Sequence, residues 1–178
     1  MTKTITFPSI TTQEIYEKSK NKVGEDKLLY NIDWYKKENF FTKEKTRKGK
    51  REVTFELQHL GKSWSECDKL KGNNDFLNFA EVVYLVWKYP EFREMLERNY
   101  TWTSSRASDG GLVHFGYSDA DGAYVDRWSP DIVYGSLGVA FSRSPENLKF
   151  DSLELSDLTS LRKEFEEFKE KVGAVLKI

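Results

Sequence analysis

Residues 104–145 read SSRASDGGLVHFGYSDADGAYVDRWSPDIVYGSLGVAFSRSP and carry the strongest structural signal in the chain. Short hydrophobic runs alternate there with DGG, DADG and SPD, which are typical turn sequences, so we predict strands joined by tight turns. The stretch contains no Lys, Glu, Gln, Asn or Met, although residues 1–103 contain 15 Lys and 12 Glu. An ordinary β-region rich in Gly and Asp contains less Lys and Glu than average, but it still contains some. We therefore interpret their complete absence as selection at the level of codons.

The composition of the whole chain limits which kinds of protein it can be. A length of 178 residues with 38% hydrophobic residues is sufficient for one domain with a core of its own. The net charge is −1 with both signs mixed, so we expect no nucleic-acid partner. A single cysteine, Cys67, excludes an internal disulfide and a cysteine-based metal cluster.

We expect no targeting signal in the chain. Its first residues, MTKTITFPSITTQ, lack the apolar segment of a signal peptide, and no apolar run is long enough to span a bilayer. We expect no membrane insertion, and the localisation stays open between a virion-associated and a cytoplasmic protein. The sequence does not indicate an oligomeric state.

Residues 1–100 predict a mixed scaffold of strands and helices. The alternation of Ile5 and Phe7 indicates a short strand, after which Thr11 or Thr12 caps a helix. The segments FFTKEK and EVTFEL on either side of TRKGKR predict a β-hairpin with a solvated basic turn.

Further helices are predicted on either side of the 104–145 stretch. One begins at Ser63 or Ser65, a strongly apolar one is capped by Asp75, and another restarts at Pro90. Residues 146–178 predict a C-terminal helical extension that is capped by Ser156 and packs on the same domain.

No pattern in the chain indicates chemistry. His59 and His114 are far apart, and neither belongs to a nucleophile–base or metal-ligand arrangement. The run Asp119-Ala120-Asp121-Gly122 resembles the start of a calcium loop, but its third ligand position and closing Glu are missing, so a hairpin turn is favoured. We expect no enzyme, no cofactor and no metal.

Three segments carry a resemblance to a known family: YTWTSSR (100–106), LVHFGYSDADGAYVDRW (112–128) and LGVAFSR (137–143). Together they resemble the C-terminal half of a C-type-lectin-like domain, and in particular the variable region of diversity-generating retroelement target proteins. That family shows a Trp-Ser/Thr-Ser-Ser start, a strand ending in Phe, a Gly-x-x-Val element and a closing Gly-Val-x-Phe-x-Arg strand. The resemblance covers about a quarter of the chain.

The resemblance implies a fold and a domain organisation. The expected fold class is α+β: N-terminal helices pack on an antiparallel sheet formed by residues 100–143, with an extra C-terminal helix. Residues 1–178 would form a single C-type-lectin-like domain. In it, residues 1–100 are scaffold, residues 101–145 display the ligand-binding side chains and residues 146–178 are the helical extension.

The resemblance also accounts for the missing residue types. In such systems an error-prone reverse transcriptase randomises template adenines, typically in Asn codons of the form AAY. These codons cannot become Lys, Glu, Gln, Met or Trp. Residues 104–145 obey this exclusion except at Trp128, which we assign to the frame.

A hypervariable surface needs a frame that does not vary. Buried apolar and special residues form the predicted frame: Trp102, Leu112, Val113, Phe115, Gly116, Gly122, Val125, Trp128, Pro130, Leu137, Gly138, Val139 and Phe141. The predicted ligand-binding positions, which we call the display positions, lie between them: Asp109, Gly110, Gly111, His114, Tyr117, Ser118, Asp119, Ala120, Asp121, Ala123, Tyr124, Asp126, Ser129, Asp131, Ile132, Val133, Tyr134, Gly135 and Ser136.

The predicted function is recognition of a protein or glycan ligand on a cell or virus surface, because Tyr, Ser, Gly and Asp are also what antibody loops use. One alternative is a constant structural or carbohydrate-binding C-type-lectin-like module of a surface or virion protein. Sugar-binding lectins carry Glu-Pro-Asn and Trp-Asn-Asp runs, to which residues 128–131 (WSPD) are the nearest approach. A second alternative is a formylglycine-generating-type enzyme. It needs a cysteine pair, whereas Cys67 is alone.

Overall fold

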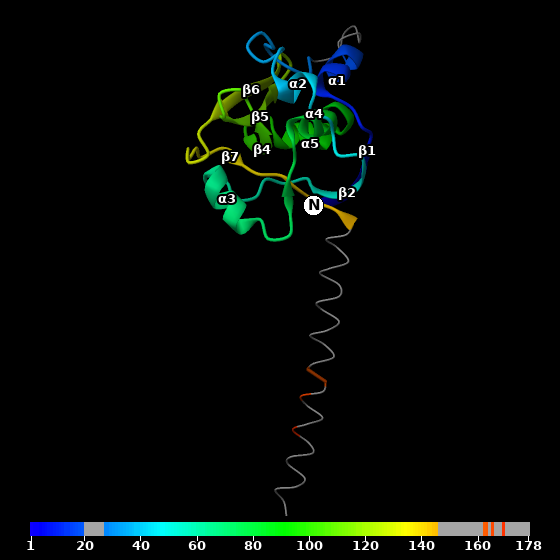
Figure 1. Cartoon of the computed structure of the whole chain (residues 1–178), viewed down its shortest axis with the longest axis vertical. Coiled ribbons are helices and arrows are strands. Elements are labelled where there is room, and N and C mark those ends of the chain that lie inside the picture. Colours follow the sequence, from blue (N-terminus) through cyan, green and yellow to red (C-terminus); the bar gives the residue numbers. More distant parts are fainter. Residues whose placement is uncertain (20–26, 146–161, 164, 166–168, 170–178) are drawn as a thin grey trace, which may run out of the picture. The chain divides into compact units, whose positions relative to one another are not determined.

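The computed structural model of the chain describes residues 1–19, 27–145, 162, 163, 165 and 169 (Figure 1). The chain forms two compact units, Met1–Arg143 and Ser144–Ile178. The described part of the first unit is an α+β fold with two four-stranded sheets. Most of the predicted C-terminal extension, including Ser156, lies outside the described residues, so its packing stays a prediction. Among the described residues, no helix combines the length and the apolarity that crossing a membrane requires.

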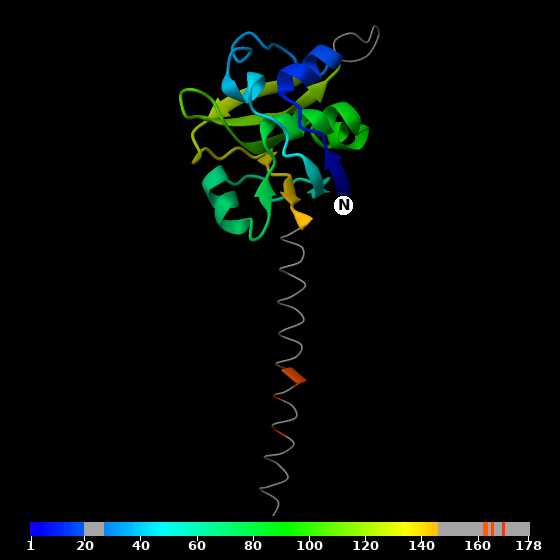
Figure 2. The same ribbon diagram turned by 45° about the vertical axis from the view of Figure 1, so that its right-hand side comes forward.

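The first sheet joins the two ends of the Met1–Arg143 unit. Its strands are β1 (Thr2–Phe7), β2 (Gly49–Thr54), β8 (Phe141–Arg143) and β3 (Asp75–Phe76), in the order β1-β2-β8-β3. All three pairings are antiparallel. Strand β8 thereby lies between segments from the first half of the chain, as Figures 1 and 2 show.

The second sheet is built almost entirely from the 104–145 stretch. Its strands are β4 (Tyr100–Arg106), β5 (Leu112–Asp119), β6 (Gly122–Trp128) and β7 (Leu137–Gly138), in the order β6-β5-β4-β7. Strands β4, β5 and β6 are antiparallel as predicted, whereas β7 pairs with β4 in parallel.

The prediction of one antiparallel sheet from residues 100–143 is therefore wrong in two respects: β7 is parallel, and β8 belongs to the other sheet. Val139 lies between β7 in the second sheet and β8 in the first, and it exchanges two backbone hydrogen bonds of 2.9 Å with Gln58. A Cβ added at Gly138 would lie 2.8 Å from the carbonyl oxygen of Gln58, so this crossing needs glycine.

Five short helices accompany the sheets within residues 1–19 and 27–145: α1 (Thr12–Ser19), α2 (Asn39–Thr42), α3 (Trp64–Leu70), α4 (Phe79–Lys88) and α5 (Pro90–Met95). The predicted starts of α3 at Ser63 and of α5 at Pro90 are confirmed. The predicted cap Asp75 is wrong, because Asp75 lies in β3 and Asn78 caps α4 in a reciprocal pair with Glu81.

The predicted hairpin around TRKGKR is also wrong. Its first arm contains the helix α2, where Phe40 and Phe41 are buried, and its second arm, β2, pairs with β1 instead. The basic turn is not simply solvated either, since the Arg47 guanidinium binds the fully buried carboxylate of Glu81.

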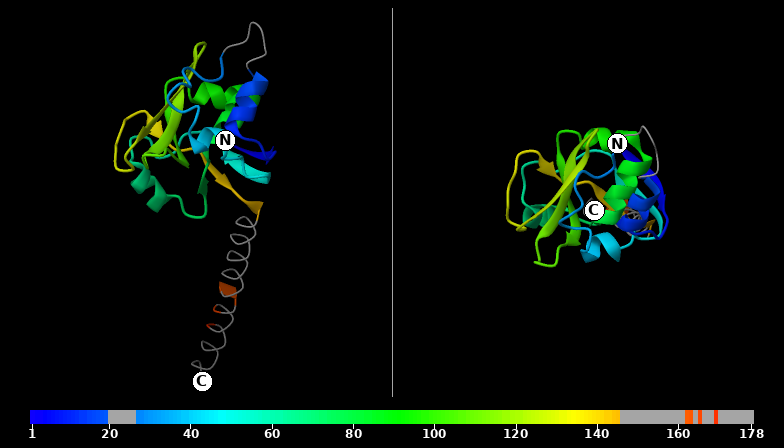
Figure 3. Two further views of the ribbon diagram at one scale, coloured as in Figure 1. Left: turned by 45° about the horizontal axis from the view of Figure 1, so that its top comes forward. Right: turned by 90° about the horizontal axis from the view of Figure 1, so that it is seen from above.

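The two faces of the second sheet have different neighbours. Its inner face contributes Val113, Phe115 and Val125 to the main core, where the Phe115 ring lies 6.1 Å from that of Phe79 in α4. Figure 3 shows the sheet between the helices α4 and α5 on one side and the yellow segment before β7 on the other. Trp102 and Leu112, on the outer face, belong to a smaller core with Cys67 of α3.

Candidate ligand-binding face

The outer face of the second sheet is organised in two rows of side chains. Tyr100, Gly116 and Tyr124 are direct neighbours across β4, β5 and β6, and Trp102, His114 and Asp126 form the next row. Side chains two residues apart along a strand point to the same side, so both rows face away from α4.

Tyrosine and tryptophan rings gather on this side. Tyr117, Tyr124 and Tyr134 are 38%, 41% and 45% exposed, while Tyr100 and Trp128 are half-buried. The Tyr100 ring lies 4.8 Å from Tyr117 and 6.4 Å from Tyr134, and the Tyr134 ring lies 5.6 Å from Trp128. We call these five residues the aromatic face.

Three residues of this surface are not among the predicted display positions. Trp128 belongs to the predicted frame, and Tyr100 and Tyr30 belong to neither set. The Tyr30 ring stacks on Tyr124 at 4.6 Å, and its backbone N–H donates to the carbonyl of Ala123. A single sequence offers no signal for this contact, because residues 30 and 124 are brought together by an isolated bridge between Leu29 and Ala123.

The segment before β7 extends the aromatic face with exposed apolar residues. Ile132 and Val133 are 43% and 59% exposed, next to Tyr134. Helix α3 holds this segment: the Ser65 N–H donates to the carbonyl of Pro130, and the Ser65 hydroxyl donates to Asp131 at 2.8 Å. Exposed apolar residues gathered in one place commonly mark a contact surface.

The display positions separate into three groups by exposure. Gly111 and Ser136 are half-buried, and His114, Ser118 and Ala123 are buried, so the expected exposure is wrong for these last three. The remaining positions are exposed: Asp109, Gly110, Tyr117, Asp119, Ala120, Asp121, Tyr124, Asp126, Ser129, Asp131, Ile132, Val133, Tyr134 and Gly135.

Strand geometry explains two of the three buried positions. Ala123 precedes Tyr124 on β6 and therefore points inward, where it joins the main core. Ser118 follows a bulge that shifts the register between Gly116 and Asp119, and its N–H donates to the carbonyl of Leu96. The bulge turns Tyr117 outward and Ser118 inward.

His114 is buried by neighbouring rings although its position in the strand points outward. The rings of Tyr100, Trp102 and Trp128 lie 5.1, 5.7 and 4.4 Å from the imidazole. Neither ring nitrogen has a hydrogen-bond partner among the described residues. Burial lowers the pKa of His114 to about 4 against the opposing effect of Asp126, so the imidazole is neutral at pH 7.

Two frame residues are less buried than predicted. Trp102, Phe115 and Phe141 are at most 1% exposed, as expected, whereas Trp128 and Pro130 are half-buried. Trp128 lies at the end of β6, where the rings of His114 and Tyr134 lie close to it. It belongs to the surface as well as to the frame.

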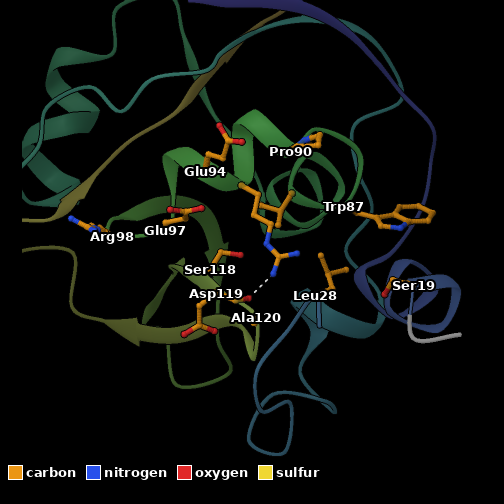
Figure 4. Close-up of a pocket in the computed structure, with 12 residues that line it drawn as sticks. Ser19, Leu28, Trp87, Pro90, Glu94, Glu97, Arg98, Ser118, Asp119 and Ala120 are labelled. Atoms are coloured by element: carbon orange, nitrogen blue, oxygen red, sulfur yellow. Dashed lines mark hydrogen bonds between the residues drawn. The ribbon is translucent and has the colours of Figure 1, made fainter. Parts of the chain in front are cut away.

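Hollows flank the aromatic face at both ends of the β5–β6 hairpin. A cleft of about 740 Å³ lies between the helices α4 and α5 and the β5–β6 turn, with Ser118, Asp119 and Ala120 on the turn side (Figure 4). Arg93 also lines this cleft, and its guanidinium donates to the Asp119 carbonyl. At the other end, residues 109–111 and 127–129 line a shallower hollow. The Asp109 carboxylate binds Arg127 there, which lowers the pKa of Asp109.

Cys67 is the one cysteine of the chain, and it is buried. Burial raises the pKa of Cys67 to about 11, so its thiol is protonated at neutral pH and is a poor nucleophile. No three His, Cys, Asp or Glu side chains within the described ranges are close enough to hold a metal ion. The Asp119 carboxylate accepts a hydrogen bond from the Asp121 N–H at 2.9 Å, as is typical of a polar turn.

Comparison of the chain with protein-family models, with curated proteins and with solved structures finds no match. The α+β class is therefore established by the structure alone, and the function rests on the chemistry of the site.

Proposed function

We propose that the chain is a hypervariable ligand-binding protein, diversified by a retroelement, which displays variable side chains on a C-type-lectin-like scaffold. Its outer face would recognise a protein or glycan on a cell or virus surface by direct contact, without metal or covalent chemistry. One observation carries the proposal. The stretch that lacks Lys, Glu, Gln, Asn and Met supplies four of the five residues of the aromatic face and the exposed segment before β7.

The separation between frame and display positions supports this proposal. A Cβ at Gly116, a frame position, would lie 2.1 Å from the carbonyl oxygen of Asn99. At Gly135, a display position, a Cβ would have no atom within 4 Å. The stretch therefore places residues that have no freedom to change next to residues that change without disturbing the core.

The side chains of the face suit recognition of a macromolecule. Tyr117, Tyr124 and Tyr134 provide rigid rings with a polar end, which bind at a low cost in conformational entropy. Asp119, Asp121 and other exposed aspartates provide adjustable hydrogen-bond acceptors around the rings. Aromatic anchors dominate most protein interfaces, and each contributes about 2 kcal/mol or more when it is truncated.

The nucleotide sequence of the locus gives the decisive test of retroelement diversification. We expect a near-repeat of codons 104–143 beside a reverse transcriptase gene, differing from the coding copy at adenines. A locus without such a repeat overturns that part of the proposal.

A library experiment tests the recognition face itself. One library randomises codons 117, 124, 126, 132 and 134 and is selected by yeast display for binding to hen lysozyme as a model ligand. A matched library randomises five exposed scaffold positions: Lys36, Lys48, Glu56, Lys88 and Glu97. We expect binders from the first library only, and equal yields from both contradict the proposal.

A further inference from the structure

The outer edge of strand β1 carries unpaired backbone groups. The Phe55 N–H donates to the Met1 carbonyl at 2.7 Å, and these two residues continue the register of the β1–β2 pair. Alternate residues of an antiparallel pair hydrogen-bond to the partner strand, so the odd-numbered residues of β1 bond to β2. The N–H and C=O groups of Thr2, Thr4 and Thr6 therefore point away from β2.

This side of β1 is open within the described part of the chain. The sheet order β1-β2-β8-β3 places β1 at an edge, and no described residue forms a backbone hydrogen bond with Thr2, Thr4 or Thr6 on the outer side. All three threonines are exposed. A strand edge with free N–H and C=O groups is a template on which a further strand pairs.

We propose that this edge pairs with the β1 edge of a second copy of the chain, in an antiparallel arrangement about a two-fold axis at Thr4. Thr4 then lies opposite Thr4 of the second copy, and Thr2 lies opposite Thr6 of the second copy. Each such pair exchanges two hydrogen bonds, so every outward N–H and C=O group of both threonine rows is satisfied. The two four-stranded sheets become one continuous sheet.

The residues around β1 select this register. Pro8 follows the strand and has no N–H, so the series of outward donors ends at Thr6. A shift of two residues in one direction brings Pro8 opposite Thr2, where it cannot donate. A shift in the other direction leaves Thr6 opposite no residue of β1. The arrangement centred on Thr4 pairs all three threonines, and it is a closed two-fold interface, the commonest kind between identical chains.

The side chains of two copies are compatible in this arrangement. Its exposed face consists of Thr–Thr pairs, which stabilise antiparallel sheets, and the charged residues Lys50 and Glu52 lie one strand further away on β2. On the inner face Lys3 lies opposite Ile5 of the second copy, and the Lys3 ammonium is already paired with Glu91. No like charges are brought directly opposite each other, so the edge complements itself.

Pairing through β1 leaves the aromatic face free for a ligand. Figures 1 and 3 show β1 on the opposite side of the Met1–Arg143 unit from β7 and the segment before it. A dimer therefore presents two aromatic faces on one particle. Two linked sites bind a ligand that is repeated on a surface with a higher overall affinity than one site, without any new contact. The dimer itself does not depend on the proposed function, whereas this consequence does.

Sedimentation equilibrium of the full chain, from about 1 µM to about 1 mM, tests the inference. We expect the mass to rise with concentration from 20.8 kDa toward twice that value. Thr4→Pro removes the central outward N–H and should hold the mass at 20.8 kDa, whereas Thr4→Val keeps this N–H and should still dimerise. The proline is compatible with the β1–β2 ladder, because the N–H that it removes faces solvent.

Two further measurements do not require the proline variant to fold. In hydrogen exchange of the parent chain, the Thr4 and Thr6 amides should exchange about ten-fold more slowly in a sample that is about nine-tenths dimeric, because the monomer alone leaves them open. The Ile5 amide, which bonds to β2, should be protected at every concentration.

The second measurement tests the register. Thr4→Cys should give a disulfide-linked dimer with oxidised glutathione as the oxidant, because the Cα atoms of a directly opposite pair lie about 5.5 Å apart. Thr2→Cys is the matched control, and it should not, since it lies opposite Thr6 of the second copy.

Several outcomes overturn the inference. These are a mass of 20.8 kDa at every concentration, a dimer that persists in folded Thr4→Pro, and exchange at Thr4 that does not depend on concentration. Equal yields of linked dimer from Thr4→Cys and Thr2→Cys overturn it as well. None of these outcomes affects the proposed function, which is tested independently by the library selection and the locus.

Discussion

The imidazole of His114 lies 4.4 Å from the indole of Trp128, and neither nitrogen of the imidazole has a hydrogen-bond partner among the described residues. A neutral histidine is tolerated in this position, but a protonated one would be a buried charge beside three aromatic rings. Within the described part of the chain, the charged group that acts on it is Asp126, on the neighbouring strand.

Stability should therefore fall at acidic pH. The pKa of His114 is lowered from 6.5 to about 4, so between these values the unfolded chain binds a proton that the folded chain does not. The contribution of neutral His114 to the free energy of unfolding is fully present above pH 6.5, and it is lost as the pH falls toward 4. The loss reaches about 3 kcal/mol, at 1.36 kcal/mol per pKa unit.

Urea denaturation at pH 7 and pH 4.5 measures this loss, and His114→Phe should reduce it markedly. Glu44 contributes to the pH dependence of stability in the opposite direction. Burial raises the pKa of Glu44, so acid favours the folded state at this residue. The comparison is accordingly made between the variant and the parent, with His59→Asn as a second histidine variant. An unchanged pH dependence in His114→Phe would show that the imidazole is not the group responsible.

The glycines of the stretch should divide into two classes. Gly116→Ala should lower the free energy of unfolding by at least about 2 kcal/mol, since its Cβ would lie 2.1 Å from a backbone oxygen. Gly135→Ala should change it by no more than about half a kcal/mol, as is normal at an open surface position. Thermal melts of the two variants provide the measurement. Equal losses would mean that frame and display positions are not distinct.

The rings should divide in the same way. Trp102→Ala should cost about 3–5 kcal/mol, because the indole is fully buried. Trp128→Ala should cost less, about 2–3 kcal/mol, since that ring is half-buried. Tyr124→Ala, which removes an exposed ring and its stacking on Tyr30, should cost about 1 kcal/mol or less. The order of the three urea midpoints checks this.

The ion pair between Arg47 and Glu81 should be important for stability. The Glu81 carboxylate is fully buried and accepts hydrogen bonds from the Arg47 guanidinium at 2.6 and 2.8 Å and from the Asn78 N–H at 3.0 Å. Arg47→Met would leave this charge without its counter-ion. Removing one partner of a fully buried ion pair lowers the free energy of unfolding by about 3–5 kcal/mol. Because the Arg47 side chain is 36% exposed, water reaches this pair, and we expect a smaller decrease of about 2–3 kcal/mol.

The matched control is Lys48→Met, which removes a positive charge from the exposed neighbouring position. It should change the free energy of unfolding by no more than about half a kcal/mol. A loss in Lys48→Met as large as that in Arg47→Met would indicate a general effect of charge instead of the specific pair.

The sequence predicted those elements whose signals are local. The strands on either side of the DADG turn, the Ser63 cap and the Pro90 restart depend on residues close in the chain, and the structure confirms all of them. The position of His114 in β5 points outward, but the rings that cover it come from Tyr100, Trp102 and Trp128.

The failures share a physical cause. The hairpin prediction treated FFTKEK as a partner for EVTFEL, whereas β2 found its partners in β1 and β8. Likewise, the stacking of Tyr30 on Tyr124 depends on a long-range bridge. Periodicity reports which face a residue occupies, but it does not report which distant segment covers that face.

Tyr117 should restrict which residues its position accepts. It has a backbone φ of 46°, in the left-handed region that residues other than Gly, Asn and Asp rarely adopt. Its N–H donates to the carbonyl of Asn99, which holds the bulge in place. Because the surrounding strands fix this conformation, the cost of a substitution depends on the backbone preference of the new residue as well as on its side chain.

We therefore expect Tyr117→Asn to be more stable than Tyr117→Val by about 1–2 kcal/mol. Both variants lose the ring contact with Tyr100, so the difference isolates the backbone, and a β-branched residue is the least suited to positive φ. Urea denaturation of the pair gives the measurement, with Tyr124→Asn and Tyr124→Val as controls, since Tyr124 lies in regular strand β6 and should show the opposite order. In natural variants that carry different display residues, position 117 should then be poor in Val and Ile. A position 117 that accepts Val as readily as Asn would show that the bulge relaxes when its residue changes.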